Sequence, residues 1–301
     1  MVAWIAGLAL VVHAASGPRG RQESQPAFKA TSELVVLHVS VEDSHGRRVA
    51  GLTEDAFSVY DNHAPQPIKM FSADEVPASI GLLIDNSASM WPHRDLMVAS
   101  VLAFAGMSHP DDEIFVLAFN EEVRTAWPPT VIADADRTAF RTALTDNITA
   151  RGMTALYDSI VDGIGRVMSG RHTRQVILIV SDGGDNASDA SLERALKLAH
   201  ESDAAVYTVS LVDPQSHESD PGFLRKLSRS SGGESFMPKR PSEVSKAFEE
   251  IARDIRSSYT IAYVPPHQAE SGERRTVRVA AKSPTGKPLI VRTRDGYFTK
   301  P

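Results

Sequence analysis

The sequence predicts an α/β protein: a doubly wound, mostly parallel sheet with a β-rich segment on each side of it in the chain. Between residues 77 and 256, short apolar runs typical of buried strands alternate with stretches of helical periodicity. This alternation indicates parallel β-α-β units with helices on both faces of one sheet. Residues 33–76 and 257–301 instead have the alternating, β-branched composition of antiparallel strands.

The N-terminus has the pattern of an export signal. Residues 1–16 combine an apolar core with small residues and predict a secretory signal peptide. The positive charge expected before that core is absent, which leaves open a start further upstream or an uncleaved signal. The core is too short to span a membrane, which takes about 20 apolar residues, so we expect no span in the mature chain. Residues 17–32 are polar and predict a disordered leader.

The composition limits the cellular location and the class of partner that we expect. The chain has no cysteine, which excludes disulfides and zinc–thiolate sites. An exported protein without disulfides fits the bacterial periplasm or extracellular space. A net charge of −6 offers no general basic surface, so we expect no nucleic-acid partner. The oligomeric state is not predicted.

The first β segment, residues 33–76, contains three strand patterns separated by turn signals. The strand patterns occupy residues 34–41, 57–60 and 68–71, and Pro77 ends the segment.

The central region, residues 77–256, contains the alternating elements. Strands are expected at residues 80–84, 114–119, 123–127, 176–180, 205–212 and 234–237. Helices are expected at residues 95–107, 137–144, 156–168, 190–200, 221–229 and 244–255. The last helix is the clearest amphipath, with apolar residues at i, i+3, i+4, i+7 and i+8 from Val244.

The second β segment, residues 257–301, predicts strands at 259–264, 276–281, 289–293 and 297–298. Three or four short strands are marginal for independent stability. Each segment also carries an apolar face with no local partner. We therefore expect the two segments to pair as one small β-sandwich, with the central domain inserted between them.

Oxygen-bearing side chains follow the buried strand at residues 80–84. Asp85, Ser87 and Ser89 occupy alternate positions at a strand-to-helix turn. Carboxylate and hydroxyl oxygens are ligands that magnesium and calcium prefer, and ligands of open α/β sheets bind at such strand ends. The alternative is that these residues only cap the turn and the next helix, because Asp and Ser are common caps.

Two later stretches favour the metal site. Thr154 stands where a loop enters a helix, and Asp182 ends the buried strand at residues 176–180. Together with Asp85, Ser87 and Ser89, this pattern resembles the metal-ion-dependent adhesion site of the von Willebrand factor type A domain, a Rossmann-like fold, over residues 77–256. The order of the segments, with Gly51-Leu52-Thr53 and Arg294-Asp295-Gly296-Tyr297 in the flanks, is similar to secreted von Willebrand type A-related proteins of Acidobacteria.

The resemblance implies a function. It implies that Asp85, Ser87, Ser89 and Thr154 contact one divalent cation, with Asp182 partly acting through water. An open coordination position would then capture an Asp or Glu of a protein partner, which implies an adhesion or scaffolding module and not an enzyme. Small neutral oxygens in an octahedral set suit magnesium or manganese better than calcium.

Two other functions compete with this one. A serine hydrolase would need a histidine paired with Ser87 or Ser89, and the sequence has no G-x-S-x-G elbow. A purely structural envelope module would need no metal at all. Trp91 and Trp127 either rim the site or pack in the core.

Overall fold

The computed structural model describes residues 34–212, 219–266 and 272–299. The predicted signal peptide, residues 1–16, and leader, residues 17–32, lie outside the described residues. All elements below belong to one compact unit, Glu33–Pro301.

A six-stranded sheet forms the central region, in the order β10-β9-β8-β5-β6-β7. Its middle strand β5 (Ala78–Asp85) pairs in parallel with β6 (Glu113–Phe119) and β8 (Arg174–Ser181). The remaining strands are β7 (Val123–Val131), β9 (Ala205–Ser210) and β10 (Ser235–Phe236), of which only β7 is antiparallel. The doubly wound, mostly parallel sheet predicted from the sequence is therefore confirmed.

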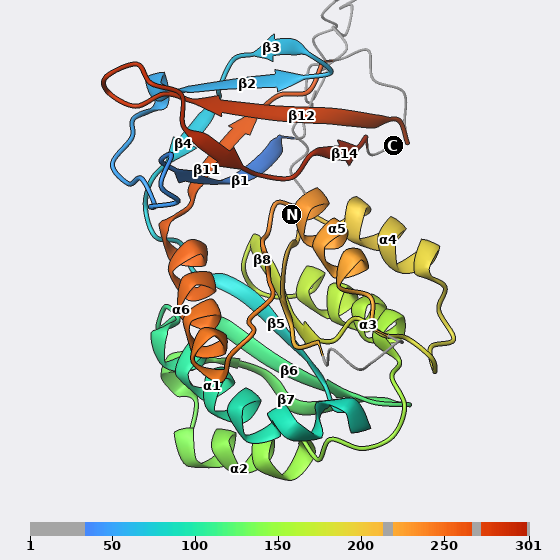
Figure 1. The fold of residues 1–301 in the computed structure, drawn as a ribbon. Coiled ribbons are helices and arrows are strands. Elements are labelled where there is room, and N and C mark those ends of the chain that lie inside the picture. Colours follow the sequence, from blue (N-terminus) through green and yellow to red (C-terminus); the bar gives the residue numbers. More distant parts are fainter. Residues whose placement is uncertain (1–33, 213–218, 267–271, 300–301) are drawn as a thin grey trace, which may run out of the picture. The chain divides into compact units, whose positions relative to one another are not determined.

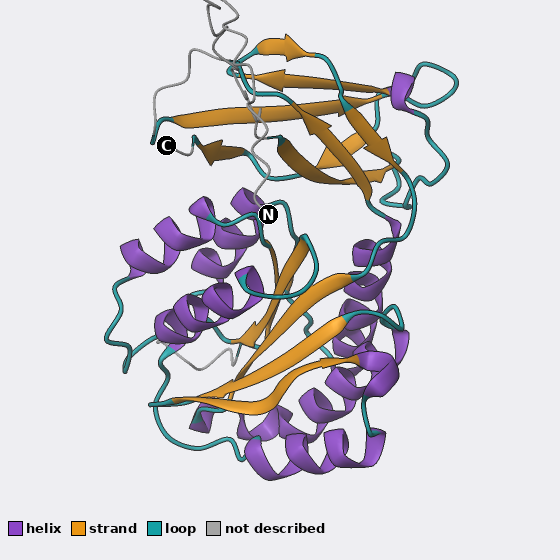
Figure 2. Cartoon of the chain, turned by 180° about the vertical axis from the view of Figure 1, so that it is seen from behind, coloured by secondary structure: helices purple, strands orange, loops and turns teal. Residues whose placement is uncertain are grey.

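Helices cover both faces of this sheet (Figures 1 and 2). One face carries α1 (Arg94–Met107), α2 (Arg137–Asn147) and α6 (Pro241–Ser257). The other carries α3 (Leu156–Met168), α4 (Leu192–Glu201) and α5 (Pro221–Ser231). Strand β5 serves both cores, since Leu82 packs on the first side and Leu83 on the second.

The order of the strands places a switch point between β5 and β8. From β5 the chain runs outward through β6 to β7, then returns to β8 and continues the other way to β9 and β10. The loops after β5 and β8 therefore diverge to opposite faces, which leaves a crevice at the carboxyl ends of these two strands.

The two β segments pair with each other, as predicted. Strand β1 (Val35–Glu42) lies between β11 (Tyr259–Tyr263) and β13 (Ile290–Arg292), and β2 (Phe57–Asp61) pairs with β12 (Arg274–Ala281). The sheets have the orders β13-β1-β11-β4 and β14-β12-β2-β3 and share one apolar core. The outer strands are β3 (Ala64–Gln66), β4 (Met70–Ser72) and β14 (Gly296–Phe298).

Several elements differ from the sequence prediction. Strand β3 was missed because it contains Pro65, which a sheet tolerates only at an edge such as this one. Strand β7 runs beyond Trp127 through two prolines, again at an edge. Short 3₁₀ helices were also missed: η1 (Glu54–Ala56), η2 (Ala88–His93) and η3 (Ile132–Asp134).

Asp61 links the two β segments inside the sandwich. Its fully buried carboxylate accepts hydrogen bonds from the Tyr263 and Tyr297 hydroxyls at 2.9 and 2.8 Å. Arg275 Nε donates to the other carboxylate oxygen at 2.7 Å. All three donors come from the C-terminal segment, so the ion pair and both hydrogen bonds exist only when the segments are paired.

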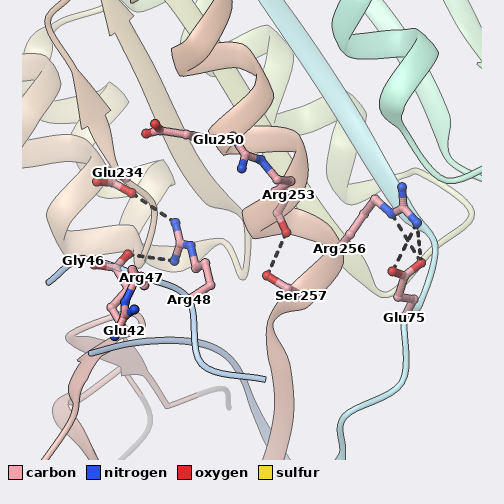
Figure 3. A pocket seen from close by; sticks show the side chains of 10 residues that line it. All are labelled: Glu42, Gly46, Arg47, Arg48, Glu75, Glu234, Glu250, Arg253, Arg256 and Ser257. Atoms are coloured by element: carbon pink, nitrogen blue, oxygen red, sulfur yellow. Dashed lines mark hydrogen bonds and ion pairs between the residues drawn. The ribbon is translucent and has the colours of Figure 1, made fainter. Parts of the chain in front are cut away.

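Asp254 of α6 links the sandwich to the α/β domain. Its carboxylate, 1% exposed, lies 2.7 Å from Arg48 and 2.5 Å from Arg292 of the sandwich. Ser40 and Tyr207 donate their hydroxyls to the same group at 2.5 and 2.8 Å. Further ion pairs line a cleft of about 680 Å³ beside Asp254 (Figure 3). In this cleft Arg48 pairs with Glu42 and Glu234, and Arg256 pairs with Glu75.

We expect Asp61→Ala to destabilise the protein by about 3–5 kcal/mol, because it leaves the buried Arg275 and two tyrosine hydroxyls without their partner. Urea unfolding measures this loss. Glu54→Ala removes an exposed carboxylate of the same segment and serves as the control, with an effect within about 0.5 kcal/mol. Equal stability of the two variants would show that Asp61 does not hold the segments together.

Candidate metal centre

Asp85 ends strand β5 with a buried carboxylate. The residue is 0% exposed. One oxygen accepts the Ser87 backbone N–H at 2.9 Å, which shapes the turn, and the other accepts the Ser181 hydroxyl at 2.6 Å. Ser181 comes from β8, so this bond joins the ends of the two strands that border the switch point.

Ser87 and Ser89 place their hydroxyls side by side. The two Oγ atoms lie 3.1 Å apart, with Ser87 buried and Ser89 exposed. Ser87 is the N-cap residue of η2, yet its side chain makes no capping hydrogen bond. The capping alternative therefore fails for Ser87, whose hydroxyl faces that of Ser89.

Asn86 fixes the loop that leads to Thr154. Its side-chain oxygen accepts the backbone N–H groups of Thr149 and Ala150, both at 2.6 Å. Its amide group donates to the Asn147 carbonyl at 3.1 Å. A single side chain thus bonds to three residues of the distant segment 147–150 and holds it against the Asp85 turn.

Thr154 lies between the loops that follow β5 and β8. Just before it, the Gly152 carbonyl accepts the Ala88 N–H at 3.1 Å. The Thr154 N–H donates to the Asn186 side chain at 2.8 Å, and the Thr154 carbonyl accepts the Asn186 N–H at 2.9 Å. The Thr154 loop is therefore bound to both strand-end loops, with Thr154 itself 7% exposed.

Asp182 follows β8 and is 5% exposed. Its Oδ1 accepts the Gly184 N–H at 2.9 Å. Gly183 between them has φ +89°, and a β-carbon there would come within 2.4 Å of the Asp220 carbonyl. Only glycine allows this turn, so the Asp182 turn depends on Gly183.

Three contributors were not identified from the sequence: Ser181, Asn86 and Asn186. Ser181 and Asn86 directly precede predicted site residues, and that adjacency was the only available signal. Asp185 accepts the Tyr157 N–H, in the first turn of α3, at 3.1 Å.

The charges of the site are unbalanced. Five described aspartates are buried: Asp61, Asp85, Asp112, Asp182 and Asp254. Arginines form ion pairs with Asp61 and Asp254. The charge of Arg174 favours the ionised form of Asp112. In the described part of the chain, no ion pair reaches Asp85 or Asp182.

Burial raises the pKa of Asp85 to about 6, although hydrogen bonds from Ser181 and Ser87 oppose the shift; the charge of Asp182 adds to it. The donor set fits a cation: two carboxylates lacking a positive partner, with neutral hydroxyls beside them. The described residues hold no group of three or more His, Cys, Asp or Glu suited to a metal ion, so a bound ion would need the hydroxyls.

The two tryptophans have different settings. Trp127 packs its ring on Phe140 at 5.0 Å between centroids, and belongs to the core. Trp91 of η2 is 66% exposed and lies two residues beyond Ser89.

Comparison with known proteins identifies the central domain. The sequence profile of the von Willebrand factor type A domain matches residues 79–251. Curated protein sequences give no significant match. A von Willebrand factor type A structure from Catenulispora acidiphila has a TM-score of 0.53 and 16% identity over 91% of this chain and 76% of its own.

Proximal thread matrix protein 1 from the mussel byssus has the same fold in part. Its TM-score is 0.53 at 17% identity, over 65% of this chain and 51% of its own. A second structure of that protein, with a zinc-occupied metal-ion-dependent adhesion site, has a TM-score of 0.51 at 16% identity, over 65% of this chain and 49% of its own.

We expect Asp85→Asn to stabilise the metal-free protein at neutral pH. Because the Asp85 pKa is raised in the folded state, folding favours the protonated carboxyl. Its contribution to stability is complete below the unfolded pKa near 4 and is lost as the pH rises through about 6. In chelator, the variant should exceed the parent by about 3 kcal/mol at pH 7.5 and by under about 1 kcal/mol at pH 4.

Thermal or urea unfolding across this pH range provides the measurement. Asp189→Asn, which neutralises an exposed aspartate in the loop after Asp182, is the control and should show no such difference. An Asp85→Asn protein that is less stable than the parent at pH 7.5 would contradict the uncompensated charge.

Proposed function

The chain belongs to the von Willebrand factor type A domain family, whose members often mediate protein–protein interaction, and from that premise we propose that it binds a protein partner through a divalent cation. Asp85, Ser87, Ser89, Thr154 and Asp182 would hold the ion. The observation that carries this proposal is the pair of buried carboxylates, Asp85 and Asp182, that no ion pair reaches among the described residues. The Ser181 hydroxyl donates to Asp85.

Each residue has a defined task in this proposal. Asp85 and Asp182 supply the negative charge, and the Ser87 and Ser89 hydroxyls add neutral oxygens. Ser181 and Asn86 hold Asp85 and the Thr154 loop in position. The ion, when bound, would offer an open position to a carboxylate of the partner.

The donor chemistry favours magnesium or manganese over calcium. Few, small and mostly neutral oxygens suit a compact octahedral ion, whereas calcium takes six to eight oxygens. The mussel relative, which holds zinc in its own site, supports the capacity of this fold for divalent ions of that size. The partner's ligand would be an Asp or Glu side chain, because hard cations prefer anionic oxygen.

We place this activity outside the cytoplasm, in the bacterial periplasm or the extracellular space, as an adhesion or scaffolding module. The apolar N-terminus and the absence of cysteine support export. Within the described residues, no helix is both long and apolar enough to cross a bilayer. The acidic balance of the chain supports a protein partner over nucleic acid.

A binding role is also favoured over hydrolysis. A serine nucleophile needs a base within hydrogen-bond reach. In the described part of the chain, the hydroxyls of Ser87 and Ser89 bond to each other and to no histidine. His93, the nearest histidine in sequence, stands at the start of α1 without a capping hydrogen bond.

Calorimetry tests the metal site directly. We expect the full chain to bind magnesium or manganese with a Kd of about millimolar or tighter, and Thr154→Ala to weaken binding at least about tenfold, which is about 1.4 kcal/mol. Thr145→Ala alters an exposed threonine of α2 and should leave binding unchanged. Absence of binding, or equal binding by both variants, would reject the site and favour a structural module.

A further inference from the structure

We propose that Trp91 and Met153 form an apolar rim beside the metal centre, and that the partner is a peptide segment carrying one acidic residue next to an aromatic or aliphatic one. This inference rests on the proposed function and specifies its partner.

Both side chains are large, apolar and exposed. Trp91 is 66% and Met153 47% exposed. Their neighbours show that this is a matter of direction: Met90 is 0% exposed and Thr154 7%. In η2, Met90 points inward and Trp91 outward. In the segment before α3, Thr154 points inward and Met153 outward. Tryptophan at a surface contact is among the residues that most often dominate binding energy.

Both side chains flank one backbone contact. In a 3₁₀ helix the side chains of residues i and i+3 lie on the same side. In η2, Trp91 is therefore on the same side as Ala88. The Ala88 N–H donates to the Gly152 carbonyl at 3.1 Å, and Met153 is the next residue. Ser89 stands between Ala88 and Trp91 in the chain, and Thr154 directly follows Met153. The apolar pair thus borders the hydroxyl ligands proposed for the cation.

Glu121 adds a negative charge beside this contact. The Glu121 carboxylate lies against Gly152, where a β-carbon would approach it to 2.1 Å. Glu121 is exposed and makes no ion pair among the described residues. A partner with a run of acidic residues would bring further negative charge next to Glu121, whereas apolar residues beside one acid would meet Trp91 and Met153.

Selection from a peptide library tests this preference. Twelve-residue peptides with one fixed central glutamate and random flanks are displayed and selected on the immobilised full chain in magnesium, and bound peptides are released with chelator. We expect aromatic or aliphatic residues to be enriched beside the glutamate and acidic residues to be depleted there.

Calorimetry with the best synthetic peptide then assigns the rim. Trp91→Ala should weaken the peptide at least about tenfold and Met153→Ala about threefold, with magnesium binding unchanged, while Trp91→Phe retains most of the affinity. Met168→Ala is the matched control, because Met168 is equally exposed (49%) at the far end of α3 from Thr154. Unchanged thermal unfolding confirms that the variants fold.

The outcomes separate the two proposals. Chelator-released peptides without apolar enrichment, or an unchanged affinity in Trp91→Ala, overturn the rim and leave the proposed function standing. Failure to recover any chelator-released peptide overturns the proposed function, and the rim with it. Apolar peptides, anionic lipid vesicles or a second copy of the chain that bind through Trp91 in the presence of chelator also overturn the inference, because the surface would then act without the metal.

Discussion

The candidate site is built around two buried carboxylates, Asp85 and Asp182, that no ion pair reaches in the described part of the chain. Elsewhere the chain neutralises buried acids: Asp61 meets Arg275, and Asp254 meets Arg48 and Arg292. Asp85 (0% exposed) and Asp182 (5% exposed) are also buried, yet no ion pair reaches either one among the described residues. Asp85 accepts hydrogen bonds from the Ser181 hydroxyl and the Ser87 N–H, and Asp182 accepts one from the Gly184 N–H. Burial of an uncompensated charge costs free energy, so a cation at this point would stabilise the fold as it creates the binding site.

The loops around these carboxylates are held in place by hydrogen bonds from uncharged side chains. Asn86 holds the segment before Thr154, Asn186 holds Thr154 itself, and Ser181 ties the ends of β5 and β8. Amides and hydroxyls position the backbone without adding charge that would compete with an ion. The site is thus preorganised by a rigid sheet and by loops that are bonded to one another.

The sandwich and the α/β domain are linked by charge as well as by the chain. Helix α6 leads directly into β11, and its Asp254 accepts contacts from Ser40, Arg48 and Arg292 of the sandwich. These partners come from both β segments, one on each side of the inserted domain in the chain. The Asp254 carboxylate therefore has all of these partners only when both β segments are in place.

The sequence by itself determined the sheet, the two-sided helical cover, the pairing of the terminal segments and the five candidate ligands. The sheet and its helical cover follow from local patterns, because burial of a strand or a helix face requires apolar residues at fixed spacing. The pairing was expected because each terminal segment has an apolar face without a local partner, and the five candidate ligands were expected from the resemblance to a family motif. Tertiary structure alone decided that Trp91 points outward while Trp127 packs on Phe140, and that Asn86 reaches across about sixty residues of chain to hold a loop. It also decided that Pro65 lies in an edge strand and that Ser87 makes no cap. Each of these depends on contacts between residues far apart in the chain, and no local pattern encodes which distant group a side chain will meet.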